Sequence, residues 1–246
     1  MRRALPLLLL ALAPAAARAQ DYARDEYTAP READVDARGA RRVSVEGHAG
    51  YLRVRGVEGL TQVRVRGTAR ASRREVLDRI RIETRRDGDV VLVRADVPDQ
   101  RDGDRWGDDN RALDLVVEVP LGIAADVRDG SGALEVRGVG ALDVEDGSGE
   151  IDVRDVASAR IRDGSGEIRV EDVRGDVRLS DGSGSIAVRR VRGSVLVEND
   201  GSGGIEVREV EGDLTVDRAR GRAISYSDVR GRVDVPRDTR GRRSWY

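Results

Sequence analysis

Hydrophobic and polar residues alternate along most of this chain, and from residue 129 onward the alternation recurs with a nearly fixed period. The tetrapeptide Asp-Gly-Ser-Gly occurs five times, at intervals of 17, 17, 18 and 19 residues. In each unit, aliphatic residues follow the aspartate at offsets of 5, 7 and 10, and a second alternating aliphatic pair comes later. A period near 20 residues with one turn per period is typical of stacked repeats. The five aspartates are Asp129, Asp146, Asp163, Asp181 and Asp200.

Each unit predicts two short strands joined by tight turns. Alternate residues of a strand point to opposite faces, so each strand buries two aliphatic side chains and exposes its polar ones. We therefore predict an all-β fold, a single-stranded parallel β-solenoid (β-helix) with about 17–19 residues per coil. The tetrapeptide should form one corner, because its glycines allow positive φ and its Asp and Ser can bond to nearby amides. The other corner is predicted at Gly175, Gly193, Gly212 and Gly231.

Residues 41–128 predict irregular N-terminal coils and a hairpin. Gly47-His48-Ala49-Gly50 occupies the place that the tetrapeptide takes in later units. Ser72-Arg73-Arg74-Glu75 fits a capping box and predicts one short helix near 73–79. Arg86-Asp87-Gly88-Asp89 predicts a hairpin turn, with the return strand at 90–96. Residues 129–236 hold the regular repeats, and we expect residues 237–246 to cap the open edge of the last coil.

The first 40 residues predict export. Residues 1–19 resemble a signal peptide, with Arg2 and Arg3, a short apolar run, and the cleavage sequence Ala17-Arg18-Ala19. Residues 20–40 are polar without periodicity and predict a disordered leader ahead of one solenoid domain at 41–246. The apolar run is too short for a standard membrane span. We expect an exported protein without a membrane span, periplasmic or extracellular, including the cell surface.

Composition narrows the chemistry. The 44 basic and 46 acidic residues nearly balance, so the chain lacks the basic footprint of a nucleic-acid binder. Cysteine is absent, and the only histidine, His48, lies in a predicted turn, so Ser-His-Asp and Cys-His sites have little to build on. We expect no catalytic residues and no enzymatic activity.

Two acidic features are the candidate sites. The five tetrapeptide aspartates should stack as a turn ladder, in which each Asp caps its own turn; the alternative is a row of Ca²⁺ sites. We favour caps, because the known Ca²⁺-binding repeat has a nine-residue period. The irregular stretch 98–110 supplies the weak metal candidates Asp102, Asp104, Asp108 and Asp109 around Trp106; the alternative there is a mobile loop. We assign no cofactor, with Ca²⁺ as the alternative.

Two stretches carry a resemblance to a known family. Val117-Glu118-Val119-Pro120 leading into the first tetrapeptide, and the run from Gly166 to Val177, resemble bacterial exported β-strand-repeat proteins called "putative adhesins", otherwise a domain of unknown function. The resemblance covers roughly residues 41–236 and supplies no catalytic or binding residues.

We therefore expect a non-enzymatic cell-envelope or surface protein, an adhesin or interaction scaffold whose partner is an envelope protein or a glycan. The alternatives are a calcium-dependent polysaccharide-binding protein or lyase on a β-helix, and a purely structural spacer.

Overall fold

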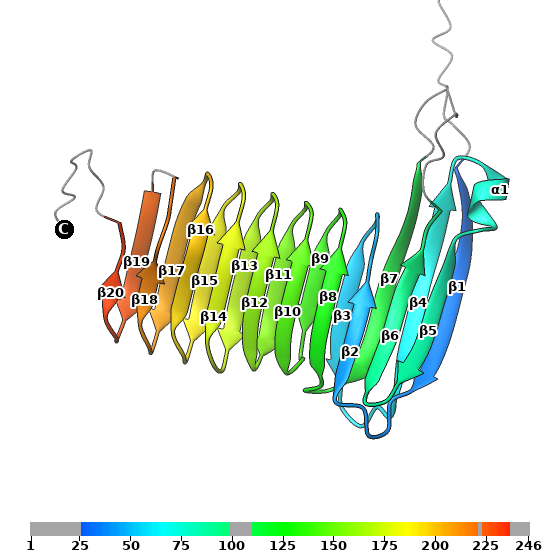
Figure 1. Cartoon of the computed structure of the whole chain (residues 1–246), viewed down its shortest axis with the longest axis horizontal. Coiled ribbons are helices and arrows are strands. Elements are labelled where there is room, and N and C mark those ends of the chain that lie inside the picture. Colours follow the sequence, from blue (N-terminus) through cyan, green and yellow to red (C-terminus); the bar gives the residue numbers. More distant parts are fainter. Residues whose placement is uncertain (1–25, 99–109, 221–222, 237–246) are drawn as a thin grey trace, which may run out of the picture.

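The computed structural model describes residues 26–98, 110–220 and 223–236, which form a rod of stacked strands (Figure 1). These residues contain two ten-stranded sheets and one short helix. In spatial order, the first sheet consists of β1 (Tyr27–Asp36), β4 (Gln62–Ala71), β7 (Arg111–Pro120), β3 (Leu52–Val57), β9 (Leu134–Arg137), β11 (Ile151–Val156), β13 (Ile168–Val173), β15 (Ile186–Val191), β17 (Gly204–Val210) and β19 (Ala223–Val229). The second sheet consists of β20 (Val233–Asp234), β18 (Leu214–Val216), β16 (Val195–Asp200), β14 (Val177–Asp181), β12 (Ser158–Asp163), β10 (Ala141–Asp146), β8 (Ala124–Asp129), β2 (Arg42–Glu46), β6 (Val90–Asp96) and β5 (Arg81–Asp87).

The regular coils confirm the predicted parallel β-solenoid. From β8 onward, each coil adds one strand to each sheet, and neighbouring coils pair in parallel register. Ile151, Ile168, Ile186 and Ile205 are successive register partners, so each aliphatic position of the repeat becomes a buried column along the rod. β-Branched side chains suit such a surface, and each one buried contributes roughly 1.5–3 kcal/mol.

The predicted tetrapeptide corner is also confirmed. Its second glycine has a φ between 128° and 148° in all five units, in the region that side chains rarely adopt. A Cβ on this glycine would collide with the backbone of the preceding coil, so only glycine lets the coils approach this closely here.

The N-terminal coils are stacked out of chain order. β3 lies between β7 and β9, and β2 lies between β6 and β8. The β2–β3 coil is therefore inserted between two coils that come later in the sequence, and the segment after Pro120 passes across it (Figure 1). The alternation of apolar and polar residues predicted these strands. It could not predict which strands pair with one another, because both edges of a strand carry the same backbone groups.

Antiparallel strands close the N-terminal end of the rod. β5 and β6 form the predicted hairpin, in which Asp87 pairs with Val90. β1 pairs antiparallel with β4, which in turn pairs antiparallel with β7. The expectation of a disordered leader at 20–40 was wrong for residues 27–36, because Ala33 and Val35 of β1 pack against the core and Arg31 donates hydrogen bonds to the Leu77 and Ile80 carbonyls at 2.8 and 2.6 Å.

The single helix is shorter than expected. Helix α1 spans Arg74–Leu77, and its N-cap is Arg73 without a side-chain capping hydrogen bond, whereas the expected capping box placed the N-cap at Ser72. Buried Leu77 anchors the helix, which packs against β4 and β1. The predicted signal peptide at 1–19 and the predicted cap at 237–246 lie outside the described residues. None of the helical structure in the described part of the chain is long and apolar enough to cross a membrane.

Candidate functional site

Four aspartates of the predicted acidic loop are the weak metal candidates. Asp102, Asp104, Asp108 and Asp109 all lie outside the described residues. Among the residues that are described, no group of three or more His, Cys, Asp or Glu side chains could hold a metal ion.

The five tetrapeptide aspartates form one column inside the rod, which we call the aspartate column. Each is the last residue of its strand in the second sheet, on β8, β10, β12, β14 and β16. Register pairing joins them in sequence, from Asp129 to Asp146, Asp163, Asp181 and Asp200. Each continues the inward positions of its strand, so the carboxyl groups face the interior rather than the solvent.

The aspartate column has only part of the hydrogen bonding that turn caps would have. All five residues are 9% exposed or less, and Asp181 and Asp200 are fully buried. One capping bond is well formed, from the Ser183 amide to Asp181 Oδ1 at 3.2 Å. Both carboxylate oxygens of Asp146, Asp163 and Asp200 are buried without a hydrogen-bond partner. Capping therefore explains the aspartate column only in part.

Burial changes the acidity of the aspartate column. Desolvation, and then the neighbouring Asp146 carboxylate, raise the pKa of Asp129 to about 7. Desolvation, and then the charge of Asp163, raise the pKa of Asp146 and of Asp181 to about 6. Burial also raises the pKa of Asp163 and Asp200. Two unit charges on adjacent strands repel by about 3 kcal/mol at a separation of ~5 Å and an effective dielectric constant of ~20. The protonated form therefore persists to higher pH in the folded rod than in the unfolded chain.

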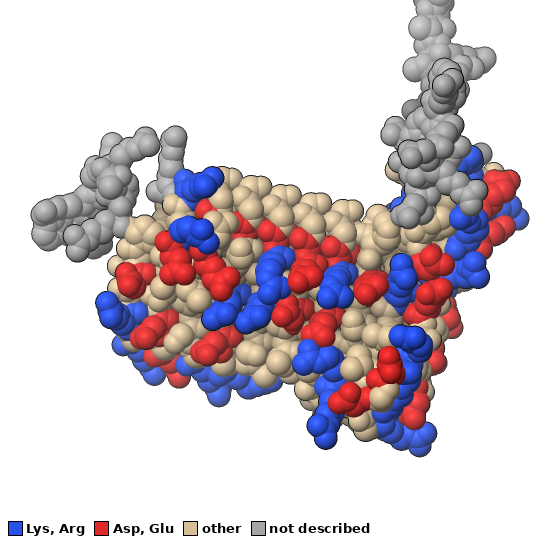
Figure 2. All heavy atoms as spheres, in the orientation of Figure 1, with Lys and Arg blue, Asp and Glu red and all other residues tan. Residues whose placement is uncertain are grey.

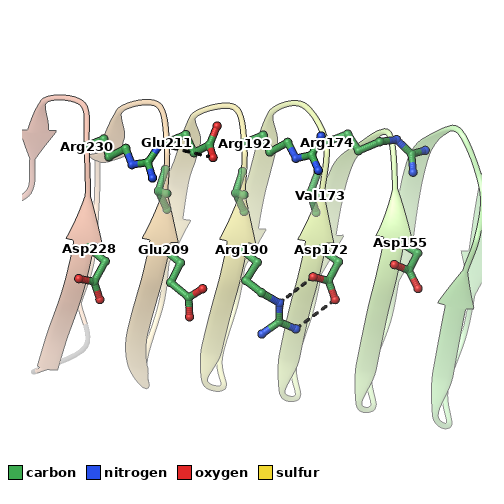
Figure 3. A pocket seen from close by; sticks show the side chains of 12 residues that line it. Asp155, Asp172, Val173, Arg174, Arg190, Arg192, Glu209, Glu211, Asp228 and Arg230 are labelled. Carbon is green, nitrogen blue, oxygen red and sulfur yellow. Dashed lines mark hydrogen bonds and ion pairs between the residues drawn. The ribbon is translucent and has the colours of Figure 1, made fainter.

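The opposite corner carries a shallow groove on the outside of the rod, with a volume of about 540 Å³ (Figure 3). One residue per coil here has a left-handed backbone, with φ between 55° and 59° and no glycine to relieve it. These residues are Asp155, Asp172, Arg190, Glu209 and Asp228. The left-handed conformation turns the chain so that the next residue, such as Val173, enters the core and the one after it points out again. The groove therefore lies between two rows of outward side chains. Within each row, successive side chains come from neighbouring coils.

Charges in the groove are only partly paired. Arg190 bonds to both carboxylate oxygens of Asp172 at 2.6 and 3.0 Å and to Glu171 at 2.9 Å. These bonds lower the pKa of Asp172. On the second row, Arg174 and Arg192 lie on consecutive coils, and their guanidinium groups have no hydrogen bond or ion pair with another described residue (Figure 3). Like charges on neighbouring strands destabilise each other, so this pair is available to an anionic group.

Elsewhere the outward charges are mostly paired between coils. Arg169 contacts Glu150 and Glu167, and Arg189 contacts Glu206 at 3.1 Å. Figure 2 shows acidic and basic side chains interspersed over the face in view. Exposed pairs of this kind contribute little individually, typically about 0.2–1 kcal/mol. Ion pairs therefore link neighbouring coils on the outside of the rod.

Sequence analysis missed the groove. The other corner was placed at Gly175, Gly193, Gly212 and Gly231, whereas the left-handed residue of each unit comes three positions earlier. A signal was available in the first unit, where the equivalent position is Gly138, with a φ of 73°. A glycine in a column of charged residues indicates a left-handed position.

Comparison with known proteins gives only distant similarity. No family model and no curated protein matches the chain. Among solved structures, the chain is similar to one described as a putative cell adhesion protein from Clostridium sporogenes, with 12% identity, 84% of this chain and 99% of that chain covered, and a TM-score of 0.35. A putative adhesin from Bacteroides fragilis has 11% identity, 85% and 96% coverage and a TM-score of 0.38. A putative lipid binding protein from Parabacteroides distasonis has 12% identity, 84% and 97% coverage and a TM-score of 0.41. Similarity this low carries no argument about function.

Proposed function

We propose that this protein is a non-enzymatic, exported cell-envelope or surface protein that uses its rod as an interaction scaffold. The observation that carries the proposal is the corner groove, in which side chains from successive coils are held in register one strand spacing apart. Such a rigid row suits an extended partner with repeated charged groups, because the rod loses little conformational freedom on binding. An envelope glycan or an envelope protein would supply such a partner.

Arg174 and Arg192 are the residues on which we base this proposal. They project from the rim of the groove on consecutive coils and lack acidic partners among the described residues. An anionic group placed between them would relieve their mutual repulsion and accept hydrogen bonds from both guanidinium groups. Binding at this place should weaken as salt concentration rises, since the contact is exposed.

The test is cosedimentation of the purified protein with isolated cell envelopes and with a panel of acidic and neutral glycans. We expect saturable binding that R174S/R192S weakens roughly tenfold, a loss of about 1.4 kcal/mol. The matched control is R160S/R178S, which removes a register pair of arginines from the other sheet and should bind like wild type.

Three outcomes would contradict the proposal. Absence of binding to every fraction would favour a structural spacer. Equal weakening by both double variants would mean nonspecific charge attraction. Binding or polysaccharide cleavage that disappears in chelator would favour the calcium-dependent alternative. Cell fractionation tests export separately, because retention in the cytoplasm would contradict that part alone.

A further inference from the structure

The aspartate column is unusual because nothing in the rod neutralises it. Its five carboxyl groups are at least nine-tenths buried and are stacked in register without interruption. The column ends in neutral residues on both sides. Gly47 adjoins Asp129 at the N-terminal end, and Ala219 bridges to Asp200 at the other.

Among the residues that the structure describes, no positive charge faces the aspartate column. The charged groups that shift these carboxyls are the neighbouring members of the column, whereas the other causes are burial and backbone amides. Arg128 and Arg162, each one residue before a column member, point outward and bond to Glu145. From the facing sheet, Leu52 approaches Gly47, which adjoins the column at its N-terminal end, and the equivalent residues of later coils are aliphatic.

Metal ions do not fit the arrangement either. Each coil contributes a single carboxyl group, and the described residues bring no three acidic or histidine side chains together. Ca²⁺ prefers six to eight oxygen ligands. The backbone carbonyls of Asp129, Asp146 and Asp163, which lie nearest, already accept hydrogen bonds from the glycine amides of the next coil.

Protons, unlike a metal ion, can neutralise the buried carboxyl groups of the aspartate column. A protonated carboxyl group carries an O–H that can donate to the oxygen of the next carboxyl group, one strand spacing away. Each proton taken up from solvent removes one buried negative charge and gives two unpartnered oxygens a hydrogen bond. A buried carboxyl group without cationic partners normally becomes neutral in this way.

We propose that the aspartate column is a buried proton-binding site, in which neighbouring carboxyl groups share protons along the rod in mildly acidic surroundings. Uptake of protons holds adjacent coils together, and their loss leaves like charges stacked inside the core. The rod is then most stable in mildly acidic surroundings and loosens as the surroundings become alkaline.

The sign follows from the raised pKa values of the column. A carboxyl group whose pKa is higher in the folded than in the unfolded chain stabilises the fold fully below the ordinary value of 3.8 and loses that effect as pH rises through its folded value. With folded pKa values of about 7 for Asp129 and about 6 for Asp146, the loss falls between about pH 4 and pH 8. Groups with lowered pKa, such as Asp36 and Asp172, have the opposite sign and act at lower pH.

The test compares urea unfolding of the full chain between about pH 5 and pH 8 with that of D129N/D146N, which replaces one register pair by neutral isosteres. We expect the unfolding constant of the wild type to rise at least roughly 100-fold over this range, and that of the variant to rise at least roughly tenfold less. D126N/D143N is the matched control, because these residues form a register pair on the same strands but face outward. The stability of this control should depend on pH as that of the wild type does. His48 is present in all three proteins, so it cannot account for a difference between them.

A second measurement does not depend on unfolding. The infrared spectrum of the folded wild type in mildly acidic solution should show the C=O stretch of protonated carboxyl groups, reduced in D129N/D146N and unchanged in D126N/D143N. The proposal is overturned if this band is missing, or if the stability of the wild type is independent of pH over the range. It is also overturned if Ca²⁺ raises the unfolding midpoint and D129N/D146N abolishes that effect, because the column would then be an ionised metal site.

Discussion

Gly166 lies at one of the tight contacts between coils, and an alanine there should cost far more than an alanine at a glycine with free space. Gly166 has a φ of 145°, and a Cβ would point at the backbone of the preceding coil, 2.6 Å from the Gly149 carbonyl carbon and 3.1 Å from its nitrogen. Side chains essentially never approach backbone atoms this closely. The backbone therefore has to change its conformation, or the two coils have to separate.

The expected cost can be worked out from the bonds that would be disturbed. Holding a non-glycine residue at this φ costs about 1–3 kcal/mol. Separating the coils would strain the hydrogen bonds from Gly149 N to Ser165 O at 2.9 Å and from Ile151 N to Glu167 O at 2.8 Å. At about 1 kcal/mol for each bond, we expect Gly166→Ala to lower the free energy of unfolding by about 4 kcal/mol. That is a large fraction of the roughly 5–15 kcal/mol typical of a folded domain.

Gly122→Ala is the matched control. Gly122 also has a positive φ, at 75°, but no atom lies within 4 Å of the position that its Cβ would take. Only the backbone preference is lost, so the cost should be about 1–2 kcal/mol. The assay is urea unfolding followed by circular dichroism, with the slope recorded as well as the midpoint, because a solenoid can unfold in part. Equal costs for the two variants would refute the argument that coil-to-coil contact, rather than φ alone, requires glycine at Gly166.

Other changes test the residues with left-handed backbone at the groove and the contacts of the N-terminal coils. Glu209→Gly should raise the free energy of unfolding by about 0.5–1 kcal/mol, because Glu209 has a φ of 58° that glycine adopts without strain; a lower midpoint in thermal unfolding would contradict this. Tyr51→Phe should cost about 1 kcal/mol by removing the 2.8 Å bond from the hydroxyl group to Glu135, an effect that urea unfolding measures against Tyr226→Phe, whose side chain is 48% exposed. Burial and the bond to Glu135 raise the pKa of Tyr51, so the difference spectrum between wild type and Tyr51→Phe should titrate above the ordinary value of 10.0, and titration at or below it would be inconsistent with this contact.

The candidate sites could be predicted only where the chemistry is local. The positions of the five aspartates at a corner of each coil followed from the spacing of the tetrapeptide. Their inward direction and their lack of hydrogen-bond partners did not, because the same Asp-Gly sequence also occurs at the exposed hairpin turn at Asp87. Whether a turn aspartate caps an amide or is buried depends on the coils stacked above and below it. The groove was missed because charged residues hold the left-handed position in the later coils, and only Gly138 of the first unit signals it in the sequence.

The sequence by itself determined the repeat, the length of a coil, the buried face of each strand and the corner glycines, because alternation and turn chemistry act within a few neighbouring residues. Only the tertiary structure decided that the β2–β3 coil is inserted between later coils and that β1 covers the N-terminal end. Alternation specifies which face of a strand is buried, but the backbone groups at its edges are the same for every sequence. The choice of neighbour therefore depends on packing between residues far apart in the chain, as for Val54, whose register partners are Val117 and Val136.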